Sequence, residues 1–127
     1  MKRACVVAAV ILCSLAAAAP ATAATDFATP HRVIYCGVSH GEPPLAVICW
    51  RPLDGLTLYM TRRGLVQRRI VLRNRGYHDP APGRILRYGQ TWKPSSDWRC
   101  VSRTTGLTCT NRVGHGWRLG TRGSTLF

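Results

Sequence analysis

His115 is the residue with the clearest potential for chemistry in this sequence, because it lies between two glycines in the run Gly114-His115-Gly116-Trp117. Small neighbours leave an imidazole accessible, and near neutral pH a histidine can accept or donate a proton. General acid–base catalysis needs a second group, and none of the five acidic residues forms a recognisable motif with His115. The competing interpretation is a tight turn in which the glycines take positive φ and His115 has a structural role.

A small basic hydrolase is the alternative functional hypothesis. Such a ribonuclease-like enzyme would use His115 with Glu42 and an arginine on a polyanionic substrate. The sequence contains no phosphate-binding glycine loop, no nucleophile elbow and no paired-carboxylate motif. It therefore favours a non-catalytic protein without a cofactor, and His115 is the one catalytic candidate.

Arginines form the densest charge cluster of the chain. On one face of a sheet they would form a cationic stripe suited to anionic polymers, such as nucleic acid or wall phosphate polymers. Exposed Tyr59, Tyr77 or Trp92 would add aromatic stacking. The competing interpretation is a solvated sheet surface without a dedicated ligand. The predicted binding residues are Arg62, Arg63, Arg68, Arg69, Arg73 and Arg75.

The N-terminal segment has the features of an export signal. It opens with two basic residues, continues as an uncharged apolar run over residues 4–19 and ends with the small-x-small pattern Ala21-Thr22-Ala23. The apolar run is shorter than the roughly 20 residues that a membrane span needs. We expect a signal peptide over residues 1–23 and one secreted domain over residues 24–127, extracellular or associated with the cell wall and without stable membrane insertion.

Removal of this segment concentrates the positive charge. The 18 lysines and arginines fall to 16 against five acidic residues, so the expected mature domain has a net charge of +11. Fifteen of the 16 are arginine, whose planar guanidinium binds phosphate and carboxylate groups in a bidentate manner. A G+C-rich genome would produce the same arginine bias. The charge itself attracts polyanions and disfavours cationic partners such as lysozymes.

The four cysteines of the secreted domain are spaced for hairpins. Twelve residues separate Cys36 from Cys49 and eight separate Cys100 from Cys109, whereas paired zinc ligands are typically about two to four residues apart. In an exported chain four cysteines predict two disulfides, each contributing about 2–4 kcal/mol to stability. We predict Cys36–Cys49 and Cys100–Cys109 and no metal site. The other two connectivities stay open from the sequence alone.

The first cysteine pair would be positioned by two strands rich in β-branched and apolar residues, over residues 32–38 and 45–50. The segment between them is rich in Gly and Pro and favours a turn. A turn centred on residues 41–44 gives a register in which cysteine faces cysteine and aromatic faces aromatic. The predicted pairs are Cys36 with Cys49 and Tyr35 with Trp50.

The second cysteine pair lies in the strand–turn–strand pattern of residues 98–111. A three-residue loop over residues 104–106 would put the two cysteines on opposite faces, because a one-residue shift inverts every side chain. A four-residue loop over residues 103–106, with Gly106 in a left-handed conformation, places them directly opposite each other. We predict the four-residue loop over residues 103–106.

The remaining pattern is also that of strands and turns. An Asp54-Gly55 turn follows the first hairpin, and a helix is the alternative to a strand near residues 65–75. The fold class predicted is mainly β, a small disulfide-stabilised antiparallel sheet, sandwich or partly open barrel after a cleaved signal helix. The expected segments are an irregular lead-in at 26–30, strands at 56–62, 66–73 and 84–92, a loop at 74–83 and a turn at 93–97.

From Phe27 onward the layout resembles a family of small exported actinobacterial proteins of unknown function. The resemblance is most specific in the C-terminal third, and the segment from Leu53 to Pro82 matches loosely. It implies export, disulfides and a β-rich fold, and it implies no activity. The residues that carry it are Phe27-Ala28-Thr29-Pro30, Cys36, Tyr88-Gly89, Arg99-Cys100, the run from Gly106 to Asn111, Gly114-His115-Gly116-Trp117 and Leu126-Phe127.

Overall fold

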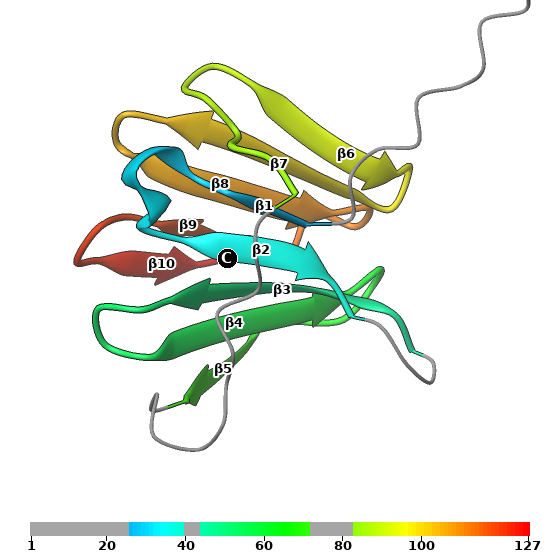
Figure 1. Cartoon of the computed structure of the whole chain (residues 1–127). Coiled ribbons are helices and arrows are strands. Elements are labelled where there is room, and N and C mark those ends of the chain that lie inside the picture. The colour runs from blue at the N-terminus through cyan, green and yellow to red at the C-terminus, as the bar shows by residue number, and fades with distance from the viewer. Residues whose placement is uncertain (1–25, 40–43, 72–82) are drawn as a thin grey trace, which may run out of the picture.

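Two five-stranded antiparallel sheets make up the protein in a computed structural model that describes residues 26–39, 44–71 and 83–127 (Figure 1). Sheet A contains, in spatial order, β1 (Asp26–Ala28), β2 (Tyr35–Val38), β3 (Ala46–Arg51), β4 (Leu56–Thr61) and β5 (Gln67–Ile70). Sheet B contains β6 (Thr91–Ser95), β7 (Trp98–Arg103), β8 (Gly106–Asn111), β9 (Gly116–Leu119) and β10 (Ser124–Leu126). The sheets do not close into a barrel, and the predicted disulfide-stabilised, mainly β fold is confirmed. The predicted signal peptide lies outside the described residues.

The first hairpin has the predicted register. Cys36 pairs with Cys49 and Tyr35 with Trp50, and the two cysteines form a disulfide with a Cα–Cα distance of 4.1 Å. The rings of Tyr35 and Trp50 lie 5.8 Å apart between centroids. The alternation of side chains along a strand explains this arrangement, because the disulfide and the aromatic pair occupy opposite faces.

The second hairpin also has the predicted register. Cys100 lies opposite Cys109 and is disulfide-bonded to it, at a Cα–Cα distance of 4.0 Å. Arg103 still pairs with Gly106, so the connection is shorter than predicted and consists of Thr104-Thr105. Gly106 has φ +133°, and an added Cβ would meet the Leu119 carbonyl oxygen at 2.6 Å. Glycine is therefore required at this corner.

The hydrophobic core lies between the inner faces of the two sheets. Both disulfides are buried within it, and Phe27 packs against Trp92 with ring centroids 4.9 Å apart. Aromatic and aliphatic side chains fill the remaining space, among them Leu58, Met60 and Trp117, which are fully buried. Because β1 and β6 each supply one ring of the Phe27–Trp92 pair, this contact joins the two sheets along one side.

The two sheets follow one plan, strand for strand. In each, the second and third strands carry the disulfide, and the first strand places an aromatic residue opposite the first cysteine, Phe27 opposite Cys36 and Trp92 opposite Cys100. In each, a short turn joins the fourth and fifth strands, the five residues 62–66 in sheet A and the four residues 120–123 in sheet B. The fold is thus a pair of similar meanders packed face to face.

A polar side chain two positions beyond the second cysteine ties each sheet to the other. In sheet A this residue is Arg51, whose Nη1 donates to the carbonyls of Gly120 (2.8 Å) and Gly123 (3.0 Å). In sheet B it is Asn111, whose Nδ2 donates to the carbonyls of Thr61 (3.1 Å) and Gly64 (2.9 Å). Each sheet therefore holds the last hairpin turn of the other.

Asp54 supports the first of these ties. Its carboxylate accepts from Nε of Arg51 at 2.9 Å and from Nη2 at 2.6 Å, so the guanidinium is gripped in a bidentate manner. The hydrogen bond from Arg51 lowers the pKa of Asp54 from 3.8 to about 2. The predicted Asp54-Gly55 turn is present, and it provides the counter-ion for a buried arginine.

Three sequence predictions about strands were wrong. Residues 26–28 form β1 instead of an irregular lead-in, because they pair with β2 and bury Phe27 and Ala28. The strand predicted from residue 32 begins only at Tyr35, after a short 3₁₀ turn, η1 (Pro30–Arg32). The strand predicted over 84–92 is interrupted by a turn at Tyr88-Gly89, and β6 extends through the predicted turn to Ser95.

The reason for the last difference is that this segment changes sheets. Ile85 forms a parallel bridge with Ala28 in sheet A, whereas the carbonyl of Gln90 accepts from the Ser102 amide of sheet B. Gly89, at φ +83°, makes the turn between these two pairings. The third and fourth predicted strands are present but shorter, and the fourth, β5, is a strand and not the alternative helix.

Two disulfides are typical of proteins that mature in an oxidising, extracellular environment. Among the residues that the structure describes, no helix has the length and apolar character needed to cross a membrane.

Candidate polyanion-binding face

The Gly114-His115-Gly116 segment is a tight connection between β8 and β9. Asn111 organises it, because its Oδ1 accepts from the amides of Val113 (3.2 Å) and His115 (3.0 Å). The structural interpretation of this turn predicted positive φ at both glycines; Gly114 has φ +93°, whereas Gly116 is not in a positive-φ conformation. Gly116 is needed for another reason: an added Cβ would lie 2.0 Å from the Cys109 carbonyl oxygen.

No catalytic partner of His115 is found in the described part of the chain. The hydrogen bonds that hold this residue use its backbone, and no ion pair or hydrogen bond joins its imidazole to a described carboxylate. Glu42, the carboxylate of the hydrolase hypothesis, lies outside the described residues. The His115–Glu42 pair stays a sequence prediction.

The predicted arginine cluster lies around β5. Arg62 and Arg63 are exposed in the β4–β5 turn, and Arg68 and Arg69 are exposed on the strand itself. Because side chains alternate along a strand, Arg68 and Arg69 project from opposite faces of sheet A. The stripe predicted to lie along one face is therefore divided here. The remaining two predicted residues, Arg73 and Arg75, lie outside the described residues.

Aromatic neighbours of this cluster are already engaged or buried. The Arg69 guanidinium lies 5.0 Å from the centroid of the Tyr59 ring and donates to the Tyr59 hydroxyl at 3.0 Å. That hydroxyl also hydrogen-bonds Gln67. Trp92, predicted as an exposed stacking residue, is 1 % exposed and belongs to the core. Tyr77 lies outside the described residues.

A different set of basic residues comes together on the outer face of sheet B. Along β7, the inward-facing Trp98 and Cys100 alternate with the exposed Arg99 and Arg103, and Arg118 of β9 lies on the same side. Apart from Phe127, the other side chains of this surface are polar or small, and none is acidic. We call this surface the basic face; it comprises Thr91, Lys93, Arg99, Val101, Arg103, Thr108, Thr110, Arg118, Thr125 and Phe127.

The strand register sets the layout of the basic face. One row across the sheet runs Arg99, Thr110, Gly116 and Phe127, and the next runs Val101, Thr108, Arg118 and Thr125. The sheet thus places the arginines at the corners of a polar, threonine-rich surface. The four basic side chains, Lys93, Arg99, Arg103 and Arg118, form no ion pair with another described residue.

A hollow of about 200 Å³ lies at the end of the basic face where β7 begins. Three cations line it, Lys93, Arg99 and Arg112, together with the hydroxyl-bearing residues Ser96 and Thr110. Asp97 is also part of its wall, and its carboxylate accepts from Arg112 at 3.3 Å. One carboxylate faces three cations, so the hollow has an excess of positive charge.

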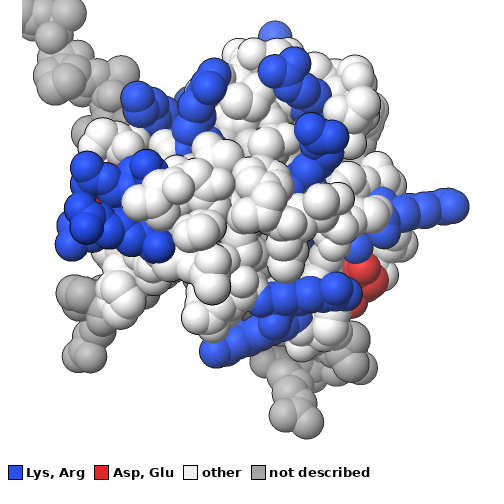
Figure 2. Space-filling view, turned by 180° about the vertical axis from the view of Figure 1, so that it is seen from behind, with Lys and Arg blue, Asp and Glu red and all other residues white. Residues whose placement is uncertain are grey.

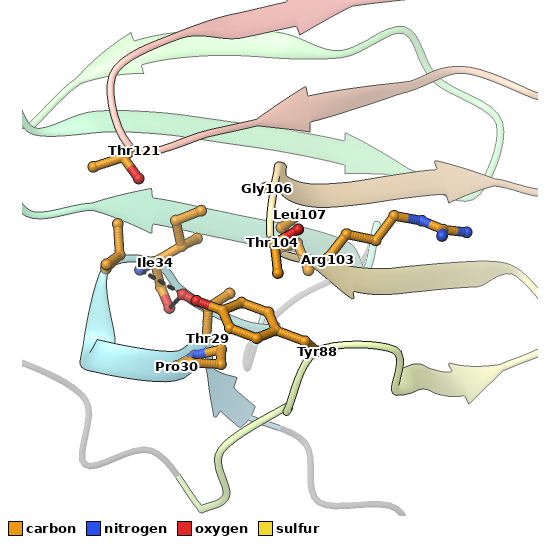
Figure 3. Close-up of a pocket in the computed structure, with 10 residues that line it drawn as sticks. Thr29, Pro30, Ile34, Tyr88, Arg103, Thr104, Gly106, Leu107 and Thr121 are labelled. Carbon is orange, nitrogen blue, oxygen red and sulfur yellow. Dashed lines mark hydrogen bonds between the residues drawn. The ribbon is translucent and has the colours of Figure 1, made fainter.

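A second, smaller hollow, of about 40 Å³, lies at the other end of β7 (Figure 3). The ring of Tyr88 lies between the Thr29–Ile34 segment and the β7–β8 hairpin, and the Arg103 side chain lines the hollow while its guanidinium points away from it. The Thr29 hydroxyl accepts a hydrogen bond from the Ile34 amide at 3.1 Å, and both residues line the hollow. Tyr88 is 49 % exposed.

Positive charge as a whole is spread over much of the surface. Figure 2 shows one side of the molecule, where basic side chains surround an uncharged central area and several gather at one edge. The basic face is therefore distinguished by arrangement, not by charge alone. Sequence reasoning missed it, although the alternation of Trp98-Arg99-Cys100 and Ser102-Arg103 already indicated outward-facing arginines.

No group of three or more His, Cys, Asp or Glu side chains in the described segments is arranged to hold a metal ion. Comparison of the chain with protein-family models, curated proteins and solved structures finds no match.

Proposed function

We propose that this protein is an exported, non-catalytic module that binds anionic polymers along the basic face of sheet B. The observation that carries the proposal is the convergence of Lys93, Arg99, Arg103 and Arg118 on one face without an acidic residue among its positions. Guanidinium groups favour bidentate contacts with phosphate, and unpaired surface cations release counterions from a polyanion when they bind it.

An extended ligand fits this surface better than a single small anion. Arg99 and Arg103 are four residues apart on β7, which corresponds to about 13 Å along the strand. The two hollows lie at the two ends of this strand, and Arg118 lies between them on β9. A small anion would contact one end, whereas a polymer can contact both ends at once.

The proposal is tested by two triple variants of equal charge. One removes the basic face, with Arg99, Arg103 and Arg118 changed to Gln. The other is the matched control, with Arg62, Arg63 and Arg68 changed to Gln, which takes the same charge from the β4–β5 region. Long-chain inorganic polyphosphate is the probe, because it carries charge without sugar or base.

The wild-type protein should bind polyphosphate tightly at low salt and progressively less tightly as salt rises. The basic-face variant should bind about 10–100-fold more weakly at low salt, and the slope of log K against log salt should fall by about 2 units. The control variant should lose much less affinity at low salt, and its slope of log K against log salt should change much less. Equal losses in the two variants, or absence of wild-type binding at low salt, would contradict the proposal.

A further inference from the structure

The basic face has aromatic side chains beside its cations, and this distinguishes among the polyanions that it could bind. In the described part of the chain, the most exposed aromatic residues are Tyr88 (49 %) and Phe127 (52 %). All four tryptophans are buried, and the ring of Tyr59 is covered by Arg69. The two open rings therefore occur next to sheet B and not on sheet A.

Phe127 lies on the basic face itself. Its backbone exchanges hydrogen bonds of 2.7 and 3.0 Å with Gly116, which continues the row that begins at Arg99 and Thr110. Its ring lies close over Gly116, because a Cβ added there would meet the Phe127 Cε2 atom at 3.1 Å. The missing side chain at Gly116 thus makes room for an aromatic ring that remains half exposed, at the end of the row that leads through Thr110 to Arg99.

Tyr88 lies at the other end of β7. Its ring forms part of the hollow shared with Arg103, Thr104 and Thr121, and the hydroxyls of these two threonines form no hydrogen bond with another described residue (Figure 3). With a volume of about 40 Å³ the hollow is much smaller than small-molecule pockets, which begin at roughly 300 Å³, so a base would stack on the exposed Tyr88 ring and not enter the hollow. The aromatic ring and the free hydroxyls beside it can contact a base, and the Arg103 guanidinium, which points away from the hollow, can contact a phosphate outside it.

Between Pro30 and Val33, which both line this hollow, the backbone has an unusual conformation. His31 and Arg32 have φ +60° and +54°, a conformation that is uncommon for residues other than glycine. Hydrogen bonds between Thr29 and the residues that follow hold it, including Arg32 N to Thr29 O at 3.0 Å. The side chains of His31 and Arg32 are both exposed, and neither residue is among those that line the hollow.

We propose that the polymer bound by the basic face is a single-stranded nucleic acid, whose bases stack on Tyr88 and Phe127 while Arg99, Arg103 and Arg118 contact its phosphates. This inference rests on the proposed function and specifies its ligand. A charged polymer without rings, such as a wall phosphate polymer, would use the cations and leave both aromatic surfaces unoccupied. Stacking is tolerant of sequence, so the binding is general and not base-specific.

The test compares ligands of equal charge. An oligothymidylate of about twelve nucleotides is matched with an abasic oligodeoxynucleotide of the same length, and inorganic polyphosphate serves as the charge-only probe. The wild-type protein should prefer the oligothymidylate to the abasic strand by about 5-fold or more. Tyr88→Ala and Phe127→Ala should each reduce this preference while leaving polyphosphate binding nearly unchanged. Tyr88→Phe, which keeps the ring, should retain it.

Tyr59→Ala, which removes an aromatic ring from sheet A, is the matched control and should retain the preference. Equal wild-type affinity for the base-containing and abasic strands would overturn the inference, and so would full preference in both alanine variants. In either case strong polyphosphate binding would leave the proposed function standing. If polyphosphate does not bind at all, the proposed function itself fails. Near-ultraviolet circular dichroism of each variant establishes that the fold is intact.

Discussion

In sheet A the side chain two positions beyond the second cysteine is Arg51, and in sheet B it is Asn111. Both donate two hydrogen bonds to carbonyls of the opposite sheet's last turn, yet one is a buried cation with a carboxylate partner and the other is a neutral amide. The same structural task is thus carried out with different chemistry. Only the sheet A version depends on charge.

The outer faces differ much more than the framework. The row Tyr35, Trp50, Thr57 and Arg69 in sheet A corresponds to Arg99, Thr110, Gly116 and Phe127 in sheet B. Inner positions are constrained by the disulfides and the core, and Gly116 is constrained by its contact with Cys109, whereas exposed outer positions such as Arg69 and Arg99 can vary with little effect on the fold. The strand arrangement common to both sheets therefore stabilises the fold, and a binding site is expected on the outer faces, where the two sheets differ.

Removal of Arg51 should have the largest effect on stability. Arg51→Met deletes two hydrogen bonds to the β9–β10 turn and the ion pair with Asp54, so the free energy of unfolding should fall by about 3 kcal/mol. Urea denaturation measures the change. Arg122→Met, in the turn itself but exposed, is the control and should alter stability by less than about 0.5 kcal/mol. Equal values for the two variants would show that the tie is dispensable.

Asn111→Ala should lower the free energy of unfolding by about 2 kcal/mol, slightly less than Arg51→Met. This side chain uses both amide hydrogens on the carbonyls of Thr61 and Gly64 and its oxygen on the amides of Val113 and His115. Hydrogen exchange distinguishes the two ties. Loss of Asn111 should accelerate exchange in the β4–β5 turn, whereas loss of Arg51 should accelerate it in the β9–β10 turn. Uniform acceleration in both variants would contradict the reciprocal arrangement.

The smallest predicted effect on the free energy of unfolding is its dependence on pH through Asp54. The pKa of Asp54 is lowered in the folded protein to about 2, so its contribution to stability is complete above about pH 4 and is lost as pH falls from about 4 to about 2. The carboxylate is 45 % exposed, and with solvent screening the contribution is about 1 kcal/mol. Asp54→Asn should therefore be less stable than wild type at pH 6, and the difference should shrink on acidification. A difference that is constant from pH 6 to pH 2 would exclude this linkage.

Local pattern predicted the parts of the fold that local interactions determine. Both cysteine registers follow from turn composition and strand alternation, and Cys36–Cys49 and Cys100–Cys109 were predicted correctly for that reason. The partners of Arg51 are 69 and 72 residues away, so no local pattern could identify them. The same holds for β1, where residues 26–28 become a strand only because β2 and Ile85 supply hydrogen-bonding partners.

For the candidate site, the sequence predicted the type of side chain, an excess of cations, but not its position in the fold. Charge indicated polyanion binding, but sequence proximity drew attention to the arginines of residues 62–75, whereas the basic face is assembled from separate strands by their register. Trp92 shows the same difficulty, since an aromatic residue at a strand start can face either side. Its burial against Phe27 depends on how the two sheets pack.

The most direct test of the account is to map the binding surface by NMR. Amide chemical shifts of the isotope-labelled protein are followed while polyphosphate is added at low salt. The account predicts that the largest changes occur on the basic face, at Arg99, Thr108, Thr110 and Arg118, with little change at Thr57, Tyr59 and Arg69 of sheet A. Changes centred on β4 and β5, or spread evenly over both sheets, would contradict it.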